Sequence, residues 1–247
     1  MATEAILELE GIVAGYGKMT ILNETSFGIR RGAITTIIGP NGAGKSTVFK
    51  AIFGLVSVRA GRIAFEGEEV TNLKPRELLE RGICYVPQGR NIFPELSVRH
   101  NLELGATALR ARGEVRGRME AAMSRFPMLR IKADAQASTL SGGEQKLLEI
   151  ARGLLLDPKL ILIDEPSIGL SPILAREVLS IVRALRNSGV TILMVEQNAK
   201  SALEVSDDGI VLELGRVRRK DAARAILNDP RIGHLFLGGS AGETGAM

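Results

Sequence analysis

A glycine-rich stretch, Gly39–Thr47, has the pattern G-x-x-x-x-G-K-[ST], which is typical of a loop that binds nucleotide phosphates. It follows an apolar run, Ile34–Ile38, and precedes a helical pattern that reaches Phe53. The glycines let backbone N–H groups surround phosphate oxygens, and the start of the helix adds positive potential. Lys45 can reach the terminal phosphates and Ser46 can ligate Mg²⁺. The residues expected to contact the nucleotide here are Asn41, Gly42, Ala43, Gly44, Lys45, Ser46 and Thr47. The alternative interpretation is a glycine-rich turn without a ligand.

Two adjacent acids, Asp164 and Glu165, directly follow a second apolar run, Leu160–Ile163. The end of such a strand is where α/β sheets place their ligands. We expect Asp164 to hold Mg²⁺ through water and Glu165 to polarise an attacking water. A strand that ends in a solvated acidic turn is the alternative, and the phosphate loop in the same chain weakens it.

The elements that position these residues are strands and helices in alternation. Strand-like runs occur at Ile6–Leu9, Ile34–Ile38, Ile63–Phe65, Ile83–Val86, Leu160–Ile163, Val190–Val195 and Gly209–Leu214. Helical patterns follow Leu140 and cover Ile173–Arg186, which Pro172 opens and Gly189 stops. Several of the runs are continuously apolar, which indicates strands covered on both faces. The sequence therefore predicts an α/β fold with a mainly parallel sheet.

The middle of the chain, from about Leu96 to Ala137, has no strand signal and is rich in Ala, Arg, Leu and Glu. It is expected to form two or three helices, broken at Gly113 and Pro127. We interpret it as a helical subdomain inserted into the sheet domain.

Composition excludes several classes of protein. The chain has 247 residues, of which 45% are hydrophobic and 24% charged, so it is globular rather than disordered. A net charge of +4 and the absence of Trp make nucleic acid an unexpected partner. The lone cysteine, Cys84, excludes an internal disulfide and is expected to be an inert core thiol. Early acids at the N-terminus predict no secretory signal, and the run Val190–Val195 is too short to span a bilayer, so a soluble protein is expected.

A pentapeptide, Leu140–Glu144 (LSGGE), resembles the signature motif of ABC-type ATPases. By its own chemistry, Ser141 with two glycine backbones at a helix N-terminus is a second anion site. The resemblance implies that Ser141, Gly142 and Gly143 complete the ATP pocket of a partner subunit in a head-to-tail dimer. It also implies the P-loop NTPase (ABC ATPase) fold, with an antiparallel β part at the N-terminus and an inserted helical subdomain.

Other positions match or depart from the family pattern. Tyr16 resembles the aromatic residue that stacks on adenine, although an exposed turn tyrosine is the alternative. Gln88 resembles the glutamine that meets Mg²⁺ or the attacking water and reports the nucleotide state to the helical subdomain. Gln197 stands where many members have a histidine that contacts the γ-phosphate, and neither His100 nor His234 is placed to substitute. Ser171 stands where an aspartate is common, so equal hydrolysis at two sites is put in question.

The stretches Gln88–Pro94, Glu165–Pro172, Val195–Ala199 and the ending from Asp229 to Gly239 resemble the LivF-type ATPases of branched-chain amino acid importers. The resemblance implies an ATP hydrolase that uses ATP and Mg²⁺, the latter held by Ser46, Gln88 and Asp164. Its implied partners are a LivG-type ATPase or a second copy, two membrane permeases and, indirectly, a periplasmic binding protein. The implied location is the cytoplasmic face of the inner membrane. Three alternatives remain: an importer of urea, amides or other amino acids, a soluble ABC ATPase acting on DNA or ribosomes, and a regulatory nucleotide binder that does not hydrolyse ATP.

The resemblance also implies a domain plan. One ABC ATPase domain is expected over 1–237, with a core lobe of 1–90 and 139–237, a helical subdomain of about 91–138 and a flexible tail over 238–247. Near Pro94, three apolar side chains are expected to form a shallow groove for a permease helix, or else to pack between the lobes: Ile92, Phe93 and Leu96. The basic run Arg216–Lys220 is interpreted as a solvated edge, with lipid headgroups as the minor alternative.

Overall fold

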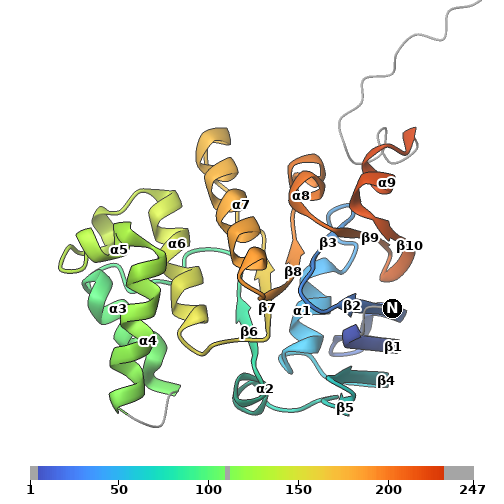
Figure 1. Ribbon diagram of the computed structural model, residues 1–247. Helices are drawn as coiled ribbons and strands as arrows, with labels where there is room; N and C mark the ends of the chain where they lie inside the picture. Colours follow the sequence, from blue (N-terminus) through green and yellow to red (C-terminus); the bar gives the residue numbers. More distant parts are fainter. Residues whose placement is uncertain (1–4, 109–111, 231–247) are drawn as a thin grey trace, which may run out of the picture. The chain divides into compact units, whose positions relative to one another are not determined.

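The computed structural model describes residues 5–108 and 112–230, and the chain divides into two compact units. The first unit combines the N-terminal part, up to Asn72, with the part from Leu193 onward, and the second unit covers Leu73–Ile192. Figure 1 labels the elements of both units. The helical subdomain expected at about 91–138 falls entirely within the second unit, while the expected domain boundaries remain a prediction.

An antiparallel sheet with the strand order β2-β1-β4-β5 belongs to the first unit. Its strands are β1 (Ala5–Tyr16), β2 (Met19–Arg30), β4 (Val58–Phe65) and β5 (Glu68–Glu69). Leu9 lies in register with Phe27 on β2 and with Ile63 on β4, and all three side chains are buried. This sheet confirms the antiparallel β part expected at the N-terminus.

The first unit also carries the larger sheet in the order β10-β9-β3-β8. These strands are β3 (Ile34–Ile38), β8 (Thr191–Val195), β9 (Asp208–Glu213) and β10 (Arg216–Ala222), and the division between the units falls within β8. β9 runs parallel to β3, and all five residues of β3 are buried, as expected of a strand covered on both faces. The helices of this unit are α1 (Lys45–Ile52), α8 (Ala199–Val205) and α9 (Ala223–Leu227).

In the second unit, β7 (Leu160–Asp164) and β6 (Ile83–Val86) pair in parallel. Its helices are α2 (Pro75–Arg81), α3 (Val98–Gly105), α4 (Arg112–Arg125), α5 (Pro127–Ile131), α6 (Gly142–Leu154) and α7 (Pro172–Asn187), with short 3₁₀ turns at Ala106–Ala108 and Ala137–Thr139. In the sequence, α3 to α6 stand between β6 and β7, and Figure 1 shows these helices grouped together. A helical insertion is therefore confirmed in this part of the chain.

Local sequence signals explain several element ends. α7 has Ser171 at its N-cap, Pro172 in its first turn and Gly189 with φ of 94° after its end. Pro127 likewise opens α5, as predicted, whereas α4 already begins at Arg112, one residue before the expected break at Gly113. Three strands, β2, β10 and the two-residue β5, were not among the predicted strand runs, and the expected tail over 238–247 lies outside the described residues.

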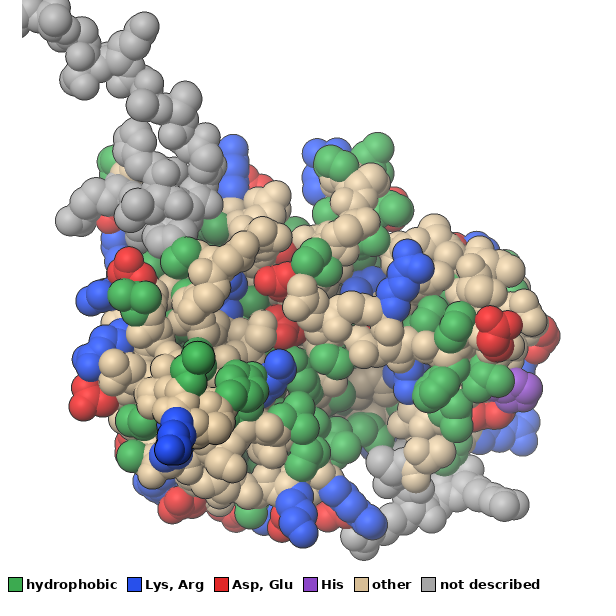
Figure 2. Space-filling model, turned by 180° about the vertical axis from the view of Figure 1, so that it is seen from behind, with side chains coloured by type: hydrophobic (Ala, Val, Ile, Leu, Met, Phe, Trp, Pro, Cys, Tyr) green, Lys and Arg blue, Asp and Glu red, His purple; other side chains and the backbone are tan. Residues whose placement is uncertain are grey.

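The basic run is β10, an exposed strand whose arginines form ion pairs. Arg216 pairs with Glu24, Arg218 with Glu213 and Arg219 with Asp221. On the face shown in Figure 2, basic and acidic side chains are interspersed. Within the described residues, no helix has the length and apolar character needed to cross a membrane.

A tight turn at Gly215 ties three parts of the first unit together. Its N–H donates to the Ala43 carbonyl oxygen at 2.9 Å. Its own carbonyl oxygen accepts from the Asn23 N–H at 2.9 Å and from the Thr25 hydroxyl at 2.5 Å. Gly215 has φ of +70°, and a Cβ there would lie 1.8 Å from the Ile21 carbonyl oxygen. Only glycine fits this position.

We therefore expect Gly215→Ala to destabilise the protein by about 3 kcal/mol or more, a fall in Tm of roughly 6–12 °C. The matched control is Gly67→Ala, since Gly67 also has positive φ (+80°) but nothing lies within 4 Å of its added Cβ. The control incurs only backbone strain of about 1–2 kcal/mol. Thermal unfolding followed by circular dichroism measures both. Equal losses in the two variants would refute the steric argument.

Candidate nucleotide-binding site

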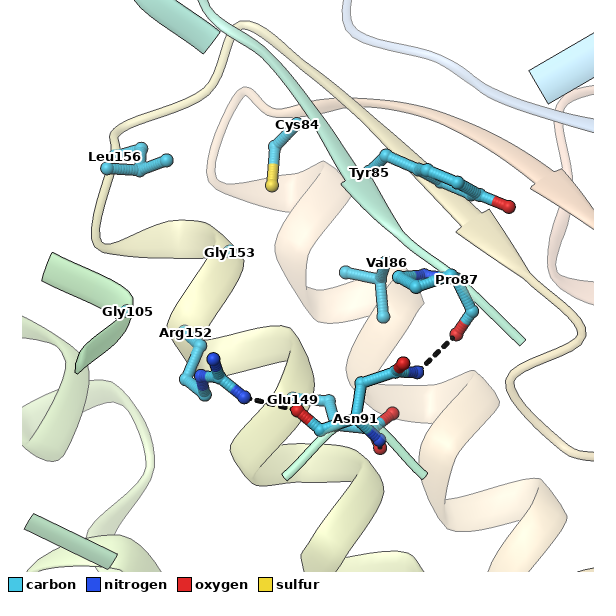
Figure 3. Close-up of a pocket in the computed structure, with 10 residues that line it drawn as sticks. All are labelled: Cys84, Tyr85, Val86, Pro87, Asn91, Gly105, Glu149, Arg152, Gly153 and Leu156. Atoms are coloured by element: carbon cyan, nitrogen blue, oxygen red, sulfur yellow. Dashed lines mark hydrogen bonds between the residues drawn. The ribbon is translucent and has the colours of Figure 1, made fainter. Parts of the chain in front are cut away.

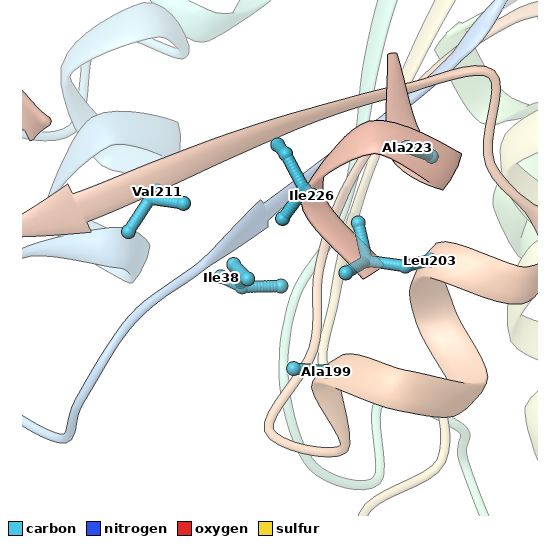
Figure 4. Close-up of a cluster of buried hydrophobic side chains, with 6 residues drawn as sticks. All are labelled: Ile38, Ala199, Leu203, Val211, Ala223 and Ile226. Atoms are coloured by element: carbon cyan, nitrogen blue, oxygen red, sulfur yellow. The ribbon is translucent and has the colours of Figure 1, made fainter. Parts of the chain in front are cut away.

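A buried apolar cluster in the first unit fixes the start of the glycine-rich loop. Ile38, the last residue of β3, packs against side chains from α8, α9 and β9. Figure 4 shows the members: Ile38, Ala199, Leu203, Val211, Ala223 and Ile226. The loop therefore begins at a rigid point of the core, one residue after a fully buried side chain.

The loop itself depends on glycine. A Cβ on Gly39 would lie 2.1 Å from the Leu212 carbonyl oxygen, so the loop passes directly against β9. Gly44, with φ of 99°, stands at the N-cap of α1 and contributes no side chain there. The first turn of α1 (Lys45, Ser46 and Thr47) contains no acidic residue. Backbone N–H groups and the positive end of the helix are thus directed at the loop, which is the arrangement that binds phosphate.

Lys45 folds back over this loop. Its side chain is buried, and Nζ donates to the carbonyl oxygens of Gly39 at 2.9 Å and Pro40 at 3.1 Å. An anion bound in the loop would form charge-assisted hydrogen bonds with this buried ammonium, so the position of Lys45 suits the phosphate contact predicted for it. The loop residues that precede Lys45, namely Asn41, Gly42 and Ala43, stay predicted phosphate contacts.

Tyr16 ends β1 with its ring 47% exposed, which leaves a face for stacking. The Lys50 Nζ lies 5.8 Å from the ring centroid. Arg59 holds the adjoining turn, since its guanidinium donates to the Gly17 carbonyl oxygen at 2.7 Å and to the Thr20 hydroxyl at 3.2 Å. The exposure suits both adenine stacking and an ordinary turn tyrosine, so the role of Tyr16 stays a prediction.

Gln197 lies just after β8, in the same unit as the glycine-rich loop, and its side chain is exposed. Its backbone N–H donates to the carboxylate of the buried Glu196 at 3.2 Å. Asn198 caps the following helix, because its Oδ1 accepts from the Ser201 N–H at 3.2 Å. The Glu196 carboxylate and the Asn198 cap thus fix the backbone on both sides of Gln197, whose side chain is exposed.

Asp164, the last residue of β7, and Glu165, the residue after it, belong to the second unit and are both buried. Asp164 Oδ2 accepts a hydrogen bond from the Tyr85 hydroxyl at 3.1 Å. Glu165 Oε2 accepts from the Gln88 side-chain amide at 2.9 Å, so two predicted site residues meet directly. Glu165 also has φ of 47°, a left-handed conformation that is uncommon for residues other than glycine. Strained backbone of this kind is concentrated at functional sites.

The signature-like motif forms the N-terminus of α6. Ser141 is the N-cap: its hydroxyl accepts from the Glu144 N–H at 3.3 Å, while the Glu144 carboxylate accepts from the Ser141 N–H at 2.8 Å. Partial burial raises the pKa of Glu144, but the hydrogen bonds from Lys132 and Ser141 outweigh it, and the net pKa lies below its usual value. A side chain at Gly142 would crowd Leu170, which precedes α7, and one at Gly143 would crowd Leu174 in the first turns of α7.

The structure thus groups the predicted residues by unit. The first unit holds Tyr16, the loop Gly39–Thr47 and Gln197, and the second holds Gln88, Ser141–Gly143, Asp164 and Glu165. Tyr85, which hydrogen-bonds Asp164, was not predicted, because in the sequence it is one aromatic residue in an apolar run. Arg59 was missed because its partners, which are backbone oxygens and the Thr20 hydroxyl, are distant in sequence.

The three predicted metal ligands carry oxygen donors. Ser46, Gln88 and Asp164 offer hydroxyl, amide and carboxylate oxygens, which are the ligand types that Mg²⁺ prefers. Ser46 belongs to the first unit and the other two residues to the second, so their joint binding of Mg²⁺ stays a prediction. Across the described parts of the chain, no group of three or more His, Cys, Asp or Glu side chains could hold a metal ion by itself. Such a cation would therefore need oxygens from other sources, such as phosphate and water.

A glycine-rich phosphate loop on a parallel strand, with a buried carboxylate pair after another strand, defines a P-loop NTPase. Within this class, residues 22–168 match the family model described as ABC transporter, and the chain belongs to the ABC transporter family. It is an ABC-type ATPase, as the signature-like motif predicted.

Relatives and solved structures agree with this assignment. The chain is 38% identical to the high-affinity branched-chain amino acid transport ATP-binding protein BraG of Pseudomonas aeruginosa, covering 95% of this chain and 100% of the relative. It is 39% identical to the probable branched-chain amino acid transport ATP-binding protein LivF of Archaeoglobus fulgidus, covering 91% and 95%. The ADP conformation of an ATP-binding cassette of an ABC transporter superposes with a TM-score of 0.85 at 31% identity, covering 96% and 100%.

Cys84 provides a test of the packing beside this site. It is 5% exposed, and burial raises the pKa of its thiol to about 12. Because the thiolate is the reactive form, a rise from about 9 to about 12 lowers the reactive fraction at pH 8 about a thousandfold. We expect iodoacetamide to leave the native protein unlabelled while it labels the guanidinium-unfolded chain. Rapid, stoichiometric labelling of the native protein, followed by mass spectrometry, would contradict the buried position.

Proposed function

We propose that this chain is the ATP-binding and ATP-hydrolysing subunit that powers the import of branched-chain amino acids through a membrane ABC transporter. The hydrolytic part rests on one observation: Glu165 is a buried carboxylate held by the Gln88 amide at 2.9 Å. The solute is proposed from the chain-long similarity to BraG and LivF. Relatives of other specificity share the same fold, so the solute needs its own test.

In the proposed reaction, the glycine-rich loop and Lys45 bind the triphosphate, and Tyr16 stacks on the base. Glu165 accepts a proton from the water that attacks the terminal phosphorus, while Gln88 orients that carboxylate. Gln197 donates a hydrogen bond to the terminal phosphate but, as a neutral amide, does not titrate. When bound, Mg²⁺ neutralises charge on the phosphate oxygens, with Ser46, Gln88 and, through water, Asp164 as its proposed ligands.

A dimer is part of the proposal. The N-terminus of α6, with the exposed Ser141 and two glycines, presents backbone N–H groups suited to an anion. We propose that it serves the nucleotide of a second ATPase subunit, either LivG-like or another copy. Ser171 uses its hydroxyl to cap α7, with Oγ accepting from the Leu174 N–H at 3.4 Å, so it offers no carboxylate to that partner.

The proposed membrane partners are two permeases, which a periplasmic binding protein supplies with solute. The docking surface is placed at the segment after Gln88, where Phe93 is 47% exposed and Ile92 and Leu96 are half-buried. A cavity of about 190 Å³ adjoins it, lined in part by Pro87, Asn91 and Arg152 (Figure 3). An exposed aromatic beside a hollow fits a short apolar helix of a permease.

The role of Glu165 predicts the behaviour of Glu165→Gln. The amide cannot accept the proton, so turnover should fall about a hundredfold or more while ATP binding is retained. Phosphate release measures turnover, and equilibrium binding of a fluorescent ATP analogue measures affinity. The control is Glu177→Gln on the exposed face of α7. Unchanged turnover in Glu165→Gln would refute the assigned role, whereas loss of binding would indicate a structural one.

The docking surface predicts a loss of partners in Phe93→Ala. The protein is purified with a tag from its own host in mild detergent, and the proteins recovered with it are identified. Two multi-pass membrane proteins and a second ATPase should accompany the native chain, and their yield should fall about tenfold in Phe93→Ala. Ile131→Ala is the control, since Ile131 is an 83% exposed apolar residue of α5.

Full recovery of the membrane proteins with Phe93→Ala would contradict the assigned surface. Recovery of ribosomes or DNA-repair proteins with the native chain, without a membrane protein, would overturn the importer. Where the membrane proteins are found, uptake of labelled leucine against labelled urea by cells with and without the protein tests the solute.

A further inference from the structure

Three charged side chains line one face of α6, directly after the signature-like motif. Lys146, Glu149 and Arg152 are spaced three residues apart, which places neighbours on the same side of a helix. The Lys146 and Glu149 side chains are only 8% and 3% exposed and form an ion pair. Buried charges are costly unless ion pairs and hydrogen bonds satisfy them. The hydrogen-bond partners of these three side chains therefore indicate the role of this face of α6.

The partners lie in the irregular segment between β6 and α3. Lys146 Nζ donates to the Gly89 carbonyl oxygen at 3.0 Å. Glu149 Oε1 accepts from the Asn91 N–H at 2.5 Å, and the Arg152 guanidinium donates to the Asn91 carbonyl oxygen. Figure 3 shows Asn91 between Arg152 and Pro87. The Asn91 side-chain amide donates to the Pro87 carbonyl oxygen at 3.0 Å. Residues 87–93 form bends rather than a helix or strand, so these contacts supply their order.

Gln88 lies within the segment 87–93, which these contacts hold in place. Gly89 and Asn91 follow it, and its own amide donates to Glu165 at 2.9 Å. A continuous series of contacts thus runs from the α6 face through Gly89 to Gln88 and Glu165. The opposite end of the segment carries Phe93, whose ring centroid lies 5.3 Å from the Arg152 guanidinium.

We propose that Lys146, Glu149 and Arg152 are positioning residues that clamp the Gln88 segment onto α6. Through this clamp, Gln88, Phe93 and the Ser141 end of α6 move as one piece. The expected effect of the clamp on ATP hydrolysis rests on the proposed function of Gln88 and Glu165. The contacts that form the clamp do not depend on that function. The surroundings of Arg152 support this proposal. Its Nε is buried without a hydrogen-bond partner, and burial lowers the pKa of its guanidinium, so the buried position of this charge costs free energy. The guanidinium nevertheless keeps its contacts with the Asn91 carbonyl oxygen and the Phe93 ring.

The test replaces the buried pair by apolar residues in Lys146→Met/Glu149→Met. Apolar replacement of a buried ion pair is often neutral for stability, so this variant is expected to fold. It removes the contacts to the Gly89 carbonyl oxygen and the Asn91 N–H. Hydrogen exchange of the peptide covering 88–93 should speed up by about tenfold or more, with exchange in α1 unchanged. The ATPase kcat should fall several-fold at unchanged KM, because the phosphate loop is untouched.

Two further variants sharpen the result. Glu149→Gln keeps an oxygen that can accept from the Asn91 N–H, so its exchange rate should lie between those of the native protein and the double variant. Glu103→Gln, an exposed carboxylate of α3, is the control and should match the native protein in exchange and kcat. If the double variant does not fold, Glu149→Gln and Arg152→Lys decide the question by the same measurements.

Native-like exchange over 88–93 in a folded double variant would overturn the clamp. A general rise in exchange with a proportionate loss of active protein would also overturn it, since that indicates a structural role alone. If the native chain itself hydrolyses no ATP, the proposed function fails, and the exchange comparison still decides on the clamp.

Discussion

A loop that binds phosphate through backbone N–H groups cannot be held in place by its own side chains, and the first unit is organised around this constraint. The loop begins directly after Ile38, whose side chain is packed in a buried apolar cluster. It is bound from the other side by the Gly215 N–H, which donates to Ala43. Both supports come from the last third of the chain, so the loop is complete only when distant segments have folded around it.

The second unit solves the opposite problem, because its chemistry lies in side chains. Glu165 is held by Gln88, and the irregular segment of Gln88 is held by the buried charged groups Lys146 and Glu149 of α6. Low local dielectric strengthens each of these contacts and makes each unpaired group expensive. Through the proposed clamp, a displacement at Phe93 would be transmitted as a rearrangement of hydrogen bonds rather than absorbed by a soft core.

The sequence allowed the glycine-rich loop between β3 and α1, the acids at the end of β7 and most strands to be predicted, because each depends on local pattern: glycine spacing, an apolar run, a cap. β2 was missed since only every second or third side chain is buried, among them Leu22, Thr25 and Phe27, and polar residues obscure the alternation. The clamp was missed for another reason. Lys146 and Glu149 resemble a surface pair at i, i+3, and their burial is decided by a segment more than fifty residues earlier in the chain.

The helical insertion also has a consequence for how such proteins diversify. It leaves the sheet after β6 and returns at β7, and these two strands are parallel neighbours in which Cys84 pairs with Ile161. A parallel pair needs a crossover, but it sets no upper limit on the length of that crossover. The helices α3 to α5 can lengthen, shorten or change their outer surface while the strand register, Gln88 and the motif at the start of α6 are preserved. A lineage can thus adapt this surface to new membrane partners without rebuilding the machinery that hydrolyses ATP.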